Sequence, residues 1–311
     1  MLPRYLRISV TARCNLHCFY CRDAAECASA ADEPGVGEIE LLGRSAAAEG
    51  VRKVRITGGE PLVREDLEEI VEAVSGVSGI TETTLTTNAI GLAERASGLK
   101  QAGLDRVNIS LDTLKTRRFR TIAGASGHRR VLAAIETCAA IFETVKLNTV
   151  LLPGVNEDEI ETLVEFALER GLWIRFIERY SHGEGEVSPH VSVKSVKRRL
   201  ERSWGTLEPL QSRSLSVEDT YRLPGEPASR VGLIASVSHP PCETCTRLRF
   251  TASGVLLPCL FARDGIDVTG PLQEGDGVAV RRAIRRAFAL KRRCLASSSP
   301  GVSSPVSYIG G

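Results

Sequence analysis

The stretch YLRISVTARCNLHCFYC, residues 5–21, joins a β-rich run to three closely spaced cysteines. Apolar and polar side chains alternate over residues 5–10, a pattern that predicts a β-strand. Cys14, Cys18 and Cys21 follow with spacings of three and two residues, without a fourth cysteine at comparable spacing. A structural zinc ion or a complete iron–sulfur cluster normally takes four protein ligands. The triplet therefore predicts either a fourth ligand of another origin, His17 or a remote residue at a zinc site, or an open metal position.

Similar β-rich runs recur through the first two thirds of the chain, separated by segments with helical apolar spacing. These runs are residues 5–10, 53–56, 83–86, 106–110, 145–150 and 173–177. Six β-then-α units predict a parallel sheet, either an open doubly wound sheet or a barrel short of the usual eight strands. Functional groups collect at the carboxyl ends of such strands, where the cysteine triplet falls.

The pattern changes at about residue 215, so we predict a barrel domain over residues 1–214 and a C-terminal domain over 215–311. Three further runs predict antiparallel strands, of which the last two are joined by a turn at Ser253 and Gly254. They are residues 231–237, 248–251 and 255–258. A basic helix is predicted to follow over residues 277–290.

Composition limits the possible function classes. The 311 residues include 40 Lys and Arg against 38 Asp and Glu, a net charge of +2 that argues against binding nucleic acid or membrane surfaces through bulk charge. No apolar run approaches the roughly 18 residues of a membrane span, and no leader-like segment precedes Cys14, so we expect a cytoplasmic protein. Disulfides are rare in that compartment, so metal binding better explains nine cysteines, six of them in two triplets.

The second triplet comprises Cys242, Cys245 and Cys259, with spacings of two and thirteen residues. His239 stands three residues before Cys242 and would complete a set of four zinc ligands. Spacing alone therefore fits a Cys3His zinc ribbon as well as an iron–sulfur cluster.

Cationic side chains recur with the two-residue period of a strand, which places them on one face. They are Arg7, Lys53, Arg55, Lys146, Arg175, Arg247 and Arg249. A single cation in a strand is usually a solvated edge residue. Seven across five strands predict instead an inward cationic face, whose desolvation requires a polyanion such as a triphosphate.

The first triplet, followed by the double glycine of RITGGEPL (residues 55–62), resembles the radical S-adenosylmethionine (SAM) superfamily. This resemblance implies a four-iron cluster on Cys14, Cys18 and Cys21, whose open iron is chelated by SAM. It also implies SAM contacts from three further positions: Tyr20 near the adenine, the backbone at Gly59, and Ser110.

Further segments in the same order narrow the resemblance to the GTP 3',8-cyclases, the family of molybdenum cofactor biosynthesis protein A. They include KVRITGGEPLVREDL, LTTNA, RVNISLDTL, VKLNTV, RFIE and SHPPCETCTRLRFTASGVLLPCLF. The resemblance implies an incomplete (βα)6 TIM-type barrel and a second 4Fe-4S cluster on Cys242, Cys245 and Cys259, whose open iron meets the guanine. The implied GTP contacts are Arg7, Arg55, Thr86, Lys146, Arg247, Leu248 and Arg249, with Lys53 and Arg175 as secondary phosphate contacts.

The activity implied is conversion of GTP to 3',8-cyclo-7,8-dihydro-GTP, the first step of molybdenum cofactor biosynthesis. A 5'-deoxyadenosyl radical would remove the 3' hydrogen, and the ribose radical would attack C8 before a further electron and proton arrive. Implied partners are an electron donor of the flavodoxin or ferredoxin type, the downstream cyclic pyranopterin monophosphate synthase and, as one option, a second copy in a homodimer. The terminal Gly310 and Gly311 would reach the active site.

Arg22, Asp23 and Tyr180 depart from the family pattern near the SAM pocket. The alternative function is therefore a diverged radical SAM enzyme with an auxiliary cluster that acts on another nucleotide or a peptide. A non-catalytic zinc-ribbon protein is the third interpretation.

Overall fold

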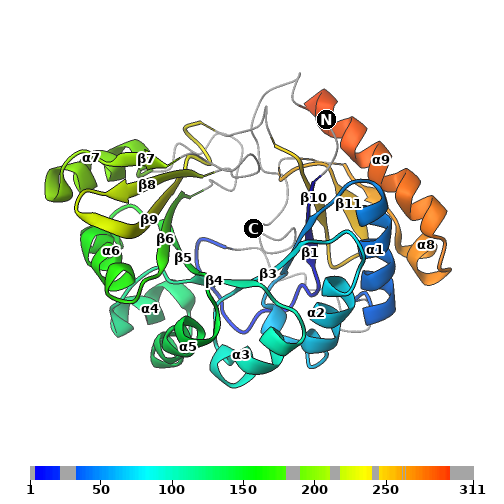
Figure 1. Ribbon diagram of the computed structural model, residues 1–311, viewed down its shortest axis with the longest axis horizontal. Coiled ribbons are helices and arrows are strands. Elements are labelled where there is room, and N and C mark those ends of the chain that lie inside the picture. Colours follow the sequence, from blue (N-terminus) through cyan, green and yellow to red (C-terminus); the bar gives the residue numbers. More distant parts are fainter. Residues whose placement is uncertain are drawn as a thin grey trace.

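The computed structural model describes residues 4–21, 33–179, 190–210, 218–239, 245–260, 262 and 264–294. Its described strands form one twelve-stranded sheet in the order β12-β11-β10-β1-β2-β3-β4-β5-β6-β9-β8-β7. The sheet curves into an open arc, with helices along its convex side (Figure 1).

Six neighbouring parallel strands form the centre of the arc, each followed by at least one helix. The strands are β1 (Tyr5–Ser9), β2 (Lys53–Thr57), β3 (Glu82–Thr87), β4 (Arg106–Ser110), β5 (Val145–Leu151) and β6 (Trp173–Glu178). The helices are α1 (Val36–Ala48), α2 (Leu67–Ser75), α3 (Leu92–Gln101), α4 (Thr116–Ala123), α5 (His128–Ile141), α6 (Ile160–Glu169) and α7 (Val193–Trp204), with short 3-10 turns η3 (Pro61–Val63) and η4 (Glu157–Glu159). The predicted incomplete (βα)6 barrel is confirmed.

The remaining strands extend both edges of this arc. They are β7 (Glu208–Leu210), β8 (Asp219–Leu223), β9 (Glu226–Ile234), β10 (Arg247–Phe250), β11 (Val255–Leu257) and β12 (Ile266–Asp267). The purely antiparallel prediction for this region is wrong in part: β9 pairs in parallel with β6, and β10 pairs in parallel with β1. An incomplete barrel leaves two edges with unpaired backbone groups, and β9 and β10 satisfy them.

The hairpin of β10 and β11 is antiparallel as predicted. One sheet includes strands from both predicted domains, so the sheet does not mark a domain boundary at residue 214. The division into residues 1–214 and 215–311 stays a prediction.

The convex face of the sheet carries the main core. Leu6, Ile8, Val54, Ile56 and Leu85 are fully buried in one cluster with apolar helix residues. Side chains alternate along a strand, so the residues between them face the concave side. The polar residues of the strands are thereby collected in the interior of the arc.

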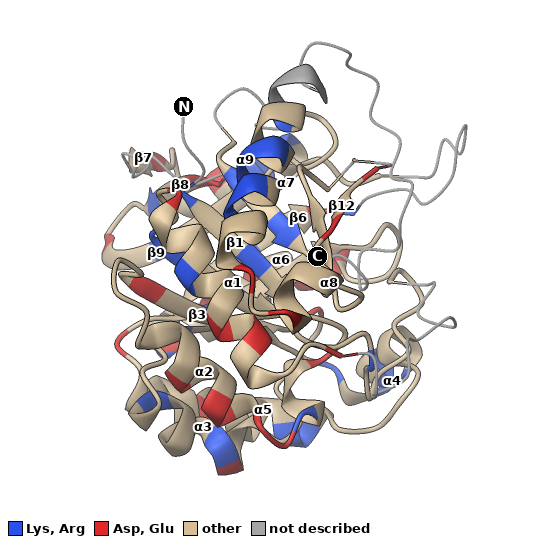
Figure 2. Cartoon of the chain, turned by 90° about the vertical axis from the view of Figure 1, so that its right-hand side faces the viewer, with Lys and Arg blue, Asp and Glu red and all other residues tan. Residues whose placement is uncertain are grey.

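Two C-terminal helices, α8 (Thr269–Gln273) and α9 (Gly277–Cys294), lie outside the β10 edge, and α9 packs against α1. Lys and Arg residues recur along α9 (Figure 2). The predicted basic helix is confirmed. No helix in the described ranges is long and apolar enough to cross a membrane.

Candidate active site

The first cysteine triplet lies in the loop that follows the carboxyl end of β1, as predicted. This loop is anchored to the end of α4, because His17 N–H donates to Ala123 O at 2.9 Å and Phe19 N–H donates to Ile122 O at 3.1 Å. Within the loop, Leu16 N–H donates to Cys14 Sγ at 3.4 Å. The three thiols are partly buried at the carboxyl end of the strands.

Burial and nearby negative charges oppose ionisation of these thiols when no metal is bound. Burial raises the pKa of Cys14 to about 11, and the negative charges of Glu60 and Cys21 act in the same direction. Burial, together with Asp112 and the two other cysteines, also raises the pKa of Cys18 well above its usual range. Metal coordination deprotonates a thiol outright and would stabilise these thiolates. Among described residues no group of three His, Cys, Asp or Glu side chains is gathered around a single metal-ion position.

Gly58 and Gly59 bring the β2 loop against the cysteine loop. Gly59 N–H donates to Thr11 O at 2.8 Å. A Cβ at Gly58, where φ is +154°, would lie 2.4 Å from Thr11 O, and a Cβ at Gly59 would lie 2.2 Å from Arg13 O. The close approach that requires glycine is therefore to the backbone of the first loop, whereas contact of Gly59 with SAM stays a prediction.

Glu60, the acidic residue of the same motif, connects the β2 loop to the end of β3, a role that the sequence reasoning missed. Its buried carboxylate accepts hydrogen bonds from Leu62 N–H at 3.0 Å, Thr87 Oγ1 at 2.6 Å and Asn88 N–H at 2.6 Å. Burial nevertheless raises the pKa of Glu60 to about 7. The motif directly follows a strand, and this position was the sequence signal that could have indicated the role of Glu60.

Tyr20 and Ser110, two of the predicted SAM contacts, lie at this same carboxyl edge of the sheet. Tyr20 Oη donates to Asp112 Oδ2 at 2.6 Å, and Val150 N–H donates to Asp112 Oδ1 at 2.9 Å. Burial raises the pKa of Asp112 to about 6 against these two hydrogen bonds. Asp112 thereby fixes the orientation of the Tyr20 ring, although sequence reasoning gave it no role.

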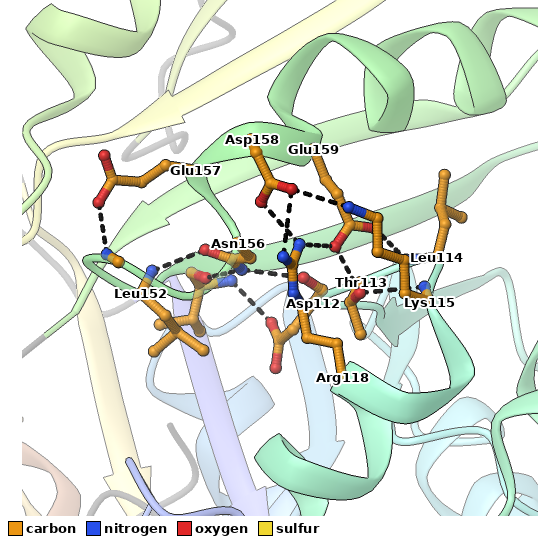
Figure 3. Close-up of polar contacts among 12 residues, drawn as sticks. Asp112, Thr113, Leu114, Lys115, Arg118, Leu152, Asn156, Glu157, Asp158 and Glu159 are labelled. Atoms are coloured by element: carbon orange, nitrogen blue, oxygen red, sulfur yellow. Dashed lines mark hydrogen bonds and ion pairs between the residues drawn. The ribbon is translucent and has the colours of Figure 1, made fainter.

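A polar network holds the loop that carries Asp112 (Figure 3). Asn156 Nδ2 donates to Asp112 O and to Val150 O, each at 2.9 Å. The buried Glu159 accepts from Thr113 Oγ1 at 2.6 Å and pairs with Arg118. The β4 and β5 loops are thus joined beneath the predicted SAM site.

The second set of cysteines lies at the opposite end of the barrel. Cys245 precedes β10, which runs parallel to β1, so Cys245 is at the amino end of the strands. Cys259 follows β11, which is antiparallel to β10, and therefore returns to that end. Cys242 lies outside the described residues, so the complete triplet stays a prediction.

Two cations adjoin Cys245, which makes its surroundings unlike those of the first triplet. Burial alone would raise the pKa of Cys245, but the charges of Arg247 and Lys291 outweigh it and lower this pKa to about 6. Arg247 Nε also donates to Cys245 Sγ at 3.5 Å. Cys245 is therefore expected to be a thiolate at neutral pH, the form that binds metals.

Cations lie between the two cysteine-bearing ends in successive levels of the sheet. Tyr5 is level with Arg247 and Lys53, whereas Arg7 is level with Arg249 and Arg55. Burial and neighbouring arginines lower the pKa of Arg55 to about 10. Arg249, Arg55, Lys146 and Arg175 are only 4%, 8%, 7% and 6% exposed. The predicted inward orientation of the cations is confirmed at these positions.

Two carboxylates that the sequence reasoning missed pair with some of these cations. Glu218 accepts from Lys146 Nζ at 3.1 Å and from Arg175 Nη1 at 3.3 Å. Glu82 accepts from Lys53 Nζ at 3.1 Å and pairs with Arg106, a further cation that was also missed. The described part of the barrel thus places eight cations on one face, four of them buried and four partly buried. The eight are Arg7, Lys53, Arg55, Arg106, Lys146, Arg175, Arg247 and Arg249.

Several polar atoms of the barrel strands are buried without a hydrogen-bond partner among the described residues. They include Ser9 Oγ, Thr86 Oγ1, Asn148 Oδ1 and Arg175 Nε. Buried polar atoms are normally satisfied, so this set indicates a polar ligand or ordered water. Leu248, by contrast, is fully buried in the main core, so any contact that it makes with GTP would come from its backbone.

Tyr5 provides a spectroscopic test of this cationic interior. Burial raises its pKa, but the charges of Arg55, Arg7 and Lys53 outweigh burial and lower the pKa to about 7. We expect tyrosinate absorbance at 295 nm to appear near pH 7 in the ligand-free protein and to be absent from the Tyr5→Phe variant. Because the pKa is below the ordinary value of about 10, phenolate formation should stabilise the fold increasingly from about pH 7 to pH 10.

A bound triphosphate should move this Tyr5 transition to higher pH, because it neutralises the same cations. Identical titrations of the wild type and Tyr5→Phe below pH 9 would contradict the cationic interior.

Some predicted residues lie outside the described parts of the chain. Neither Arg22, Asp23 and Tyr180 nor the terminal Gly310 and Gly311 can be placed relative to this site.

Known sequences resemble this chain over nearly its whole length. Residues 8–167 match the Radical SAM superfamily, and residues 172–296 match Molybdenum Cofactor Synthesis C. The GTP 3',8-cyclase of Pelotomaculum thermopropionicum is 40% identical over 294 residues, which cover 92% of this chain and 90% of that protein. The GTP 3',8-cyclase of Moorella thermoacetica is 41% identical with the same two coverages.

Solved structures support the fold. Streptococcus suis SuiB bound to S-adenosylmethionine aligns with a TM-score of 0.64 at 17% identity, over 86% of this chain and 63% of that chain. Another SuiB structure aligns with a TM-score of 0.66, also at 17% identity, over 95% of this chain and 70% of that chain. At this identity the likeness concerns architecture alone, whereas the sequence matches decide the family. The chain belongs to the GTP 3',8-cyclase family of the radical SAM superfamily.

Proposed function

We propose that this protein is a radical SAM GTP 3',8-cyclase, which converts GTP to 3',8-cyclo-7,8-dihydro-GTP in the first step of molybdenum cofactor biosynthesis. The observation that carries the proposal is the gathering of eight cations, four of them buried, between two cysteine-bearing ends of one barrel. A triphosphate supplies the negative charge that these side chains require, since guanidinium groups engage phosphate oxygens in pairs.

At the carboxyl end of the barrel, Cys14, Cys18 and Cys21 would hold a 4Fe-4S cluster, with SAM bound beside Tyr20, Gly59 and Ser110. When bound, this cluster and SAM supply the one-electron chemistry that removes a hydrogen atom from the ribose of GTP. The Tyr20–Asp112 hydrogen bond at 2.6 Å would keep the aromatic ring in place against the adenine. The contribution of the chain here is orientation and exclusion of water.

GTP would lie along the concave face, with its triphosphate among Arg7, Arg55, Lys146, Arg249 and, as secondary contacts, Lys53 and Arg175. Thr86 and the 247–249 segment, with Arg247 and the Leu248 backbone, would provide the remaining contacts. Strand rise is about 3.3 Å per residue, so the five residues from Tyr5, level with Arg247, to Val10 separate the two ends by roughly 16 Å. The second 4Fe-4S cluster, on Cys242, Cys245 and Cys259, would then face the guanine from the amino end.

The proposal includes the surroundings of the enzyme. It would be cytoplasmic, receive electrons from a flavodoxin- or ferredoxin-type donor and pass its product to cyclic pyranopterin monophosphate synthase. A homodimer is compatible with this assignment. The two domains would be residues 1–214 and 215–311.

Anaerobic turnover with GTP tests the function directly. Reconstituted protein is incubated with SAM, reductant and GTP, and the products are identified by mass analysis. We expect 5'-deoxyadenosine formation stimulated by GTP, together with a cyclised dihydro product of GTP. The proposal would be overturned if GTP did not raise the rate of SAM cleavage whereas another nucleotide or a peptide did.

A further inference from the structure

Lys291 is a buried cation that lies outside the proposed GTP contacts. It belongs to the last part of α9 and is only 3% exposed, although the outer face of that helix is basic (Figure 2). Its Nζ donates to Arg247 O at 2.8 Å and to Pro258 O at 2.9 Å. Lys291 therefore binds the first residue of β10 and the residue directly after β11.

The two carbonyl acceptors flank the second set of cysteines. Arg247 follows Cys245 by two residues, and Pro258 immediately precedes Cys259. Burial lowers the pKa of Lys291, and negative charge on Cys245 and Cys259 acts in the opposite direction, so both cysteines are its electrostatic neighbours. An ammonium group has three N–H donors, and these two carbonyls accept from two of them.

Two neutral carbonyls satisfy the hydrogen bonds of a buried ammonium group but do not balance its charge. Burying a charge is costly unless a partner of opposite charge is present. A cluster held by thiolates becomes more negative on reduction, so it is the partner that this position requires.

We propose that Lys291 is a positioning residue of the second cluster, which joins the two ends of the β10–β11 hairpin beside Cys245 and Cys259 and stabilises the reduced cluster. The inference rests on the second cluster of the proposed function. A positive charge beside the ligand sulfurs favours the more negative redox state. Lys291 therefore keeps the reduction potential of this cluster above that of a cluster with a neutral neighbour.

Three substitutions separate charge from hydrogen bonding. Lys291→Arg keeps the charge and the donors, Lys291→Gln keeps donors without charge, and Lys291→Met removes both. Lys100→Gln is the matched control, because Lys100 is an exposed residue on the distant helix α3. The readouts are iron per chain and anaerobic redox titration followed by electron paramagnetic resonance, with the first cluster as an internal reference.

We expect Lys291→Gln to lower the ratio of reduced to oxidised second cluster about tenfold at a fixed potential, a shift of about 59 mV for one electron. Lys291→Arg and Lys100→Gln should leave this ratio within about twofold, and none of the four variants should shift the first cluster. Lys291→Met should lose iron selectively from the second cluster. Loss of that cluster from Lys291→Gln but not from Lys291→Arg would also support the proposal.

An unchanged second-cluster potential in Lys291→Gln would overturn the inference, as would equal shifts in the Arg and Gln variants. These results are distinct from failure of the proposed function. Wild-type protein with about eight irons that does not cyclise GTP defeats the function alone, whereas about four irons in the wild type would defeat both.

Discussion

Cys18→Ala is expected to abolish SAM cleavage and to lower the iron content from about eight to about four atoms per chain. Three thiolates hold the proposed first cluster, and the loss of one leaves two corners without a protein ligand. The loop around Cys18 is held by backbone bonds from His17 and Phe19 to α4, so it should keep its shape without the thiol. The measurements are iron and sulfide analysis, and chromatography of 5'-deoxyadenosine.

Cys138→Ala is the matched control, because it makes the same chemical change away from both cysteine sets. Cys138 is fully buried in the core on α5. Removing its sulfur should cost about 1 kcal/mol of stability and leave about eight irons and full SAM cleavage. Equal iron loss from the two variants would show that Cys18 supports folding rather than a cluster.

The central architecture could be predicted because its signals are local. Each strand of the barrel has a two-residue period, and each helix between them has an apolar face, so the β–α order and the inward face of Arg55 and Lys146 follow from spacing. The parallel pairing of β9 and β10 could not be predicted in this way. It depends on which edges of the arc remain open, a property of the assembled sheet.

The site residues that sequence reasoning missed also divide into those without a local signal and those with one. Glu218 reaches Lys146 and Arg175 from a segment more than 40 residues further along the chain, with no local pattern to mark it. Lys291 did carry a local signal, because residues 284, 288 and 291 share one helical face and Ile284 and Phe288 are buried. A lysine in register with buried apolar residues predicts a buried cation, which the overall basic composition of the helix concealed.

The Glu218 carboxylate is expected to make a large contribution to the stability of the fold. It is 8% exposed and bridges Lys146 and Arg175. Burial opposes ionisation, but these two cations outweigh it and lower the pKa of Glu218 to about 2. Against an ordinary value near 4.5, the shift corresponds to roughly 3 kcal/mol. That stability should be complete above about pH 4.5 and be lost as the pH falls towards 2.

Glu218→Gln should lower the free energy of unfolding by about 3–5 kcal/mol at pH 7, because two buried cations lose their carboxylate. Anaerobic urea unfolding of the holoenzyme, followed by tryptophan fluorescence, measures this loss. Glu136→Gln is the control: Glu136 is an exposed partner of Arg170 at 2.7 Å, and an exposed ion pair contributes about 1 kcal/mol or less.

GTP should restore part of the unfolding free energy that Glu218→Gln loses. Its triphosphate supplies negative charge to Lys146 and Arg175, which no longer face a carboxylate in this variant. The increase in unfolding free energy on adding GTP should therefore be larger for Glu218→Gln than for the wild type or Glu136→Gln. Guanosine, which has the same base and ribose without phosphates, should not produce this difference. Equal stabilisation of all three proteins by GTP would mean that Lys146 and Arg175 serve the fold alone, and that the triphosphate binds elsewhere.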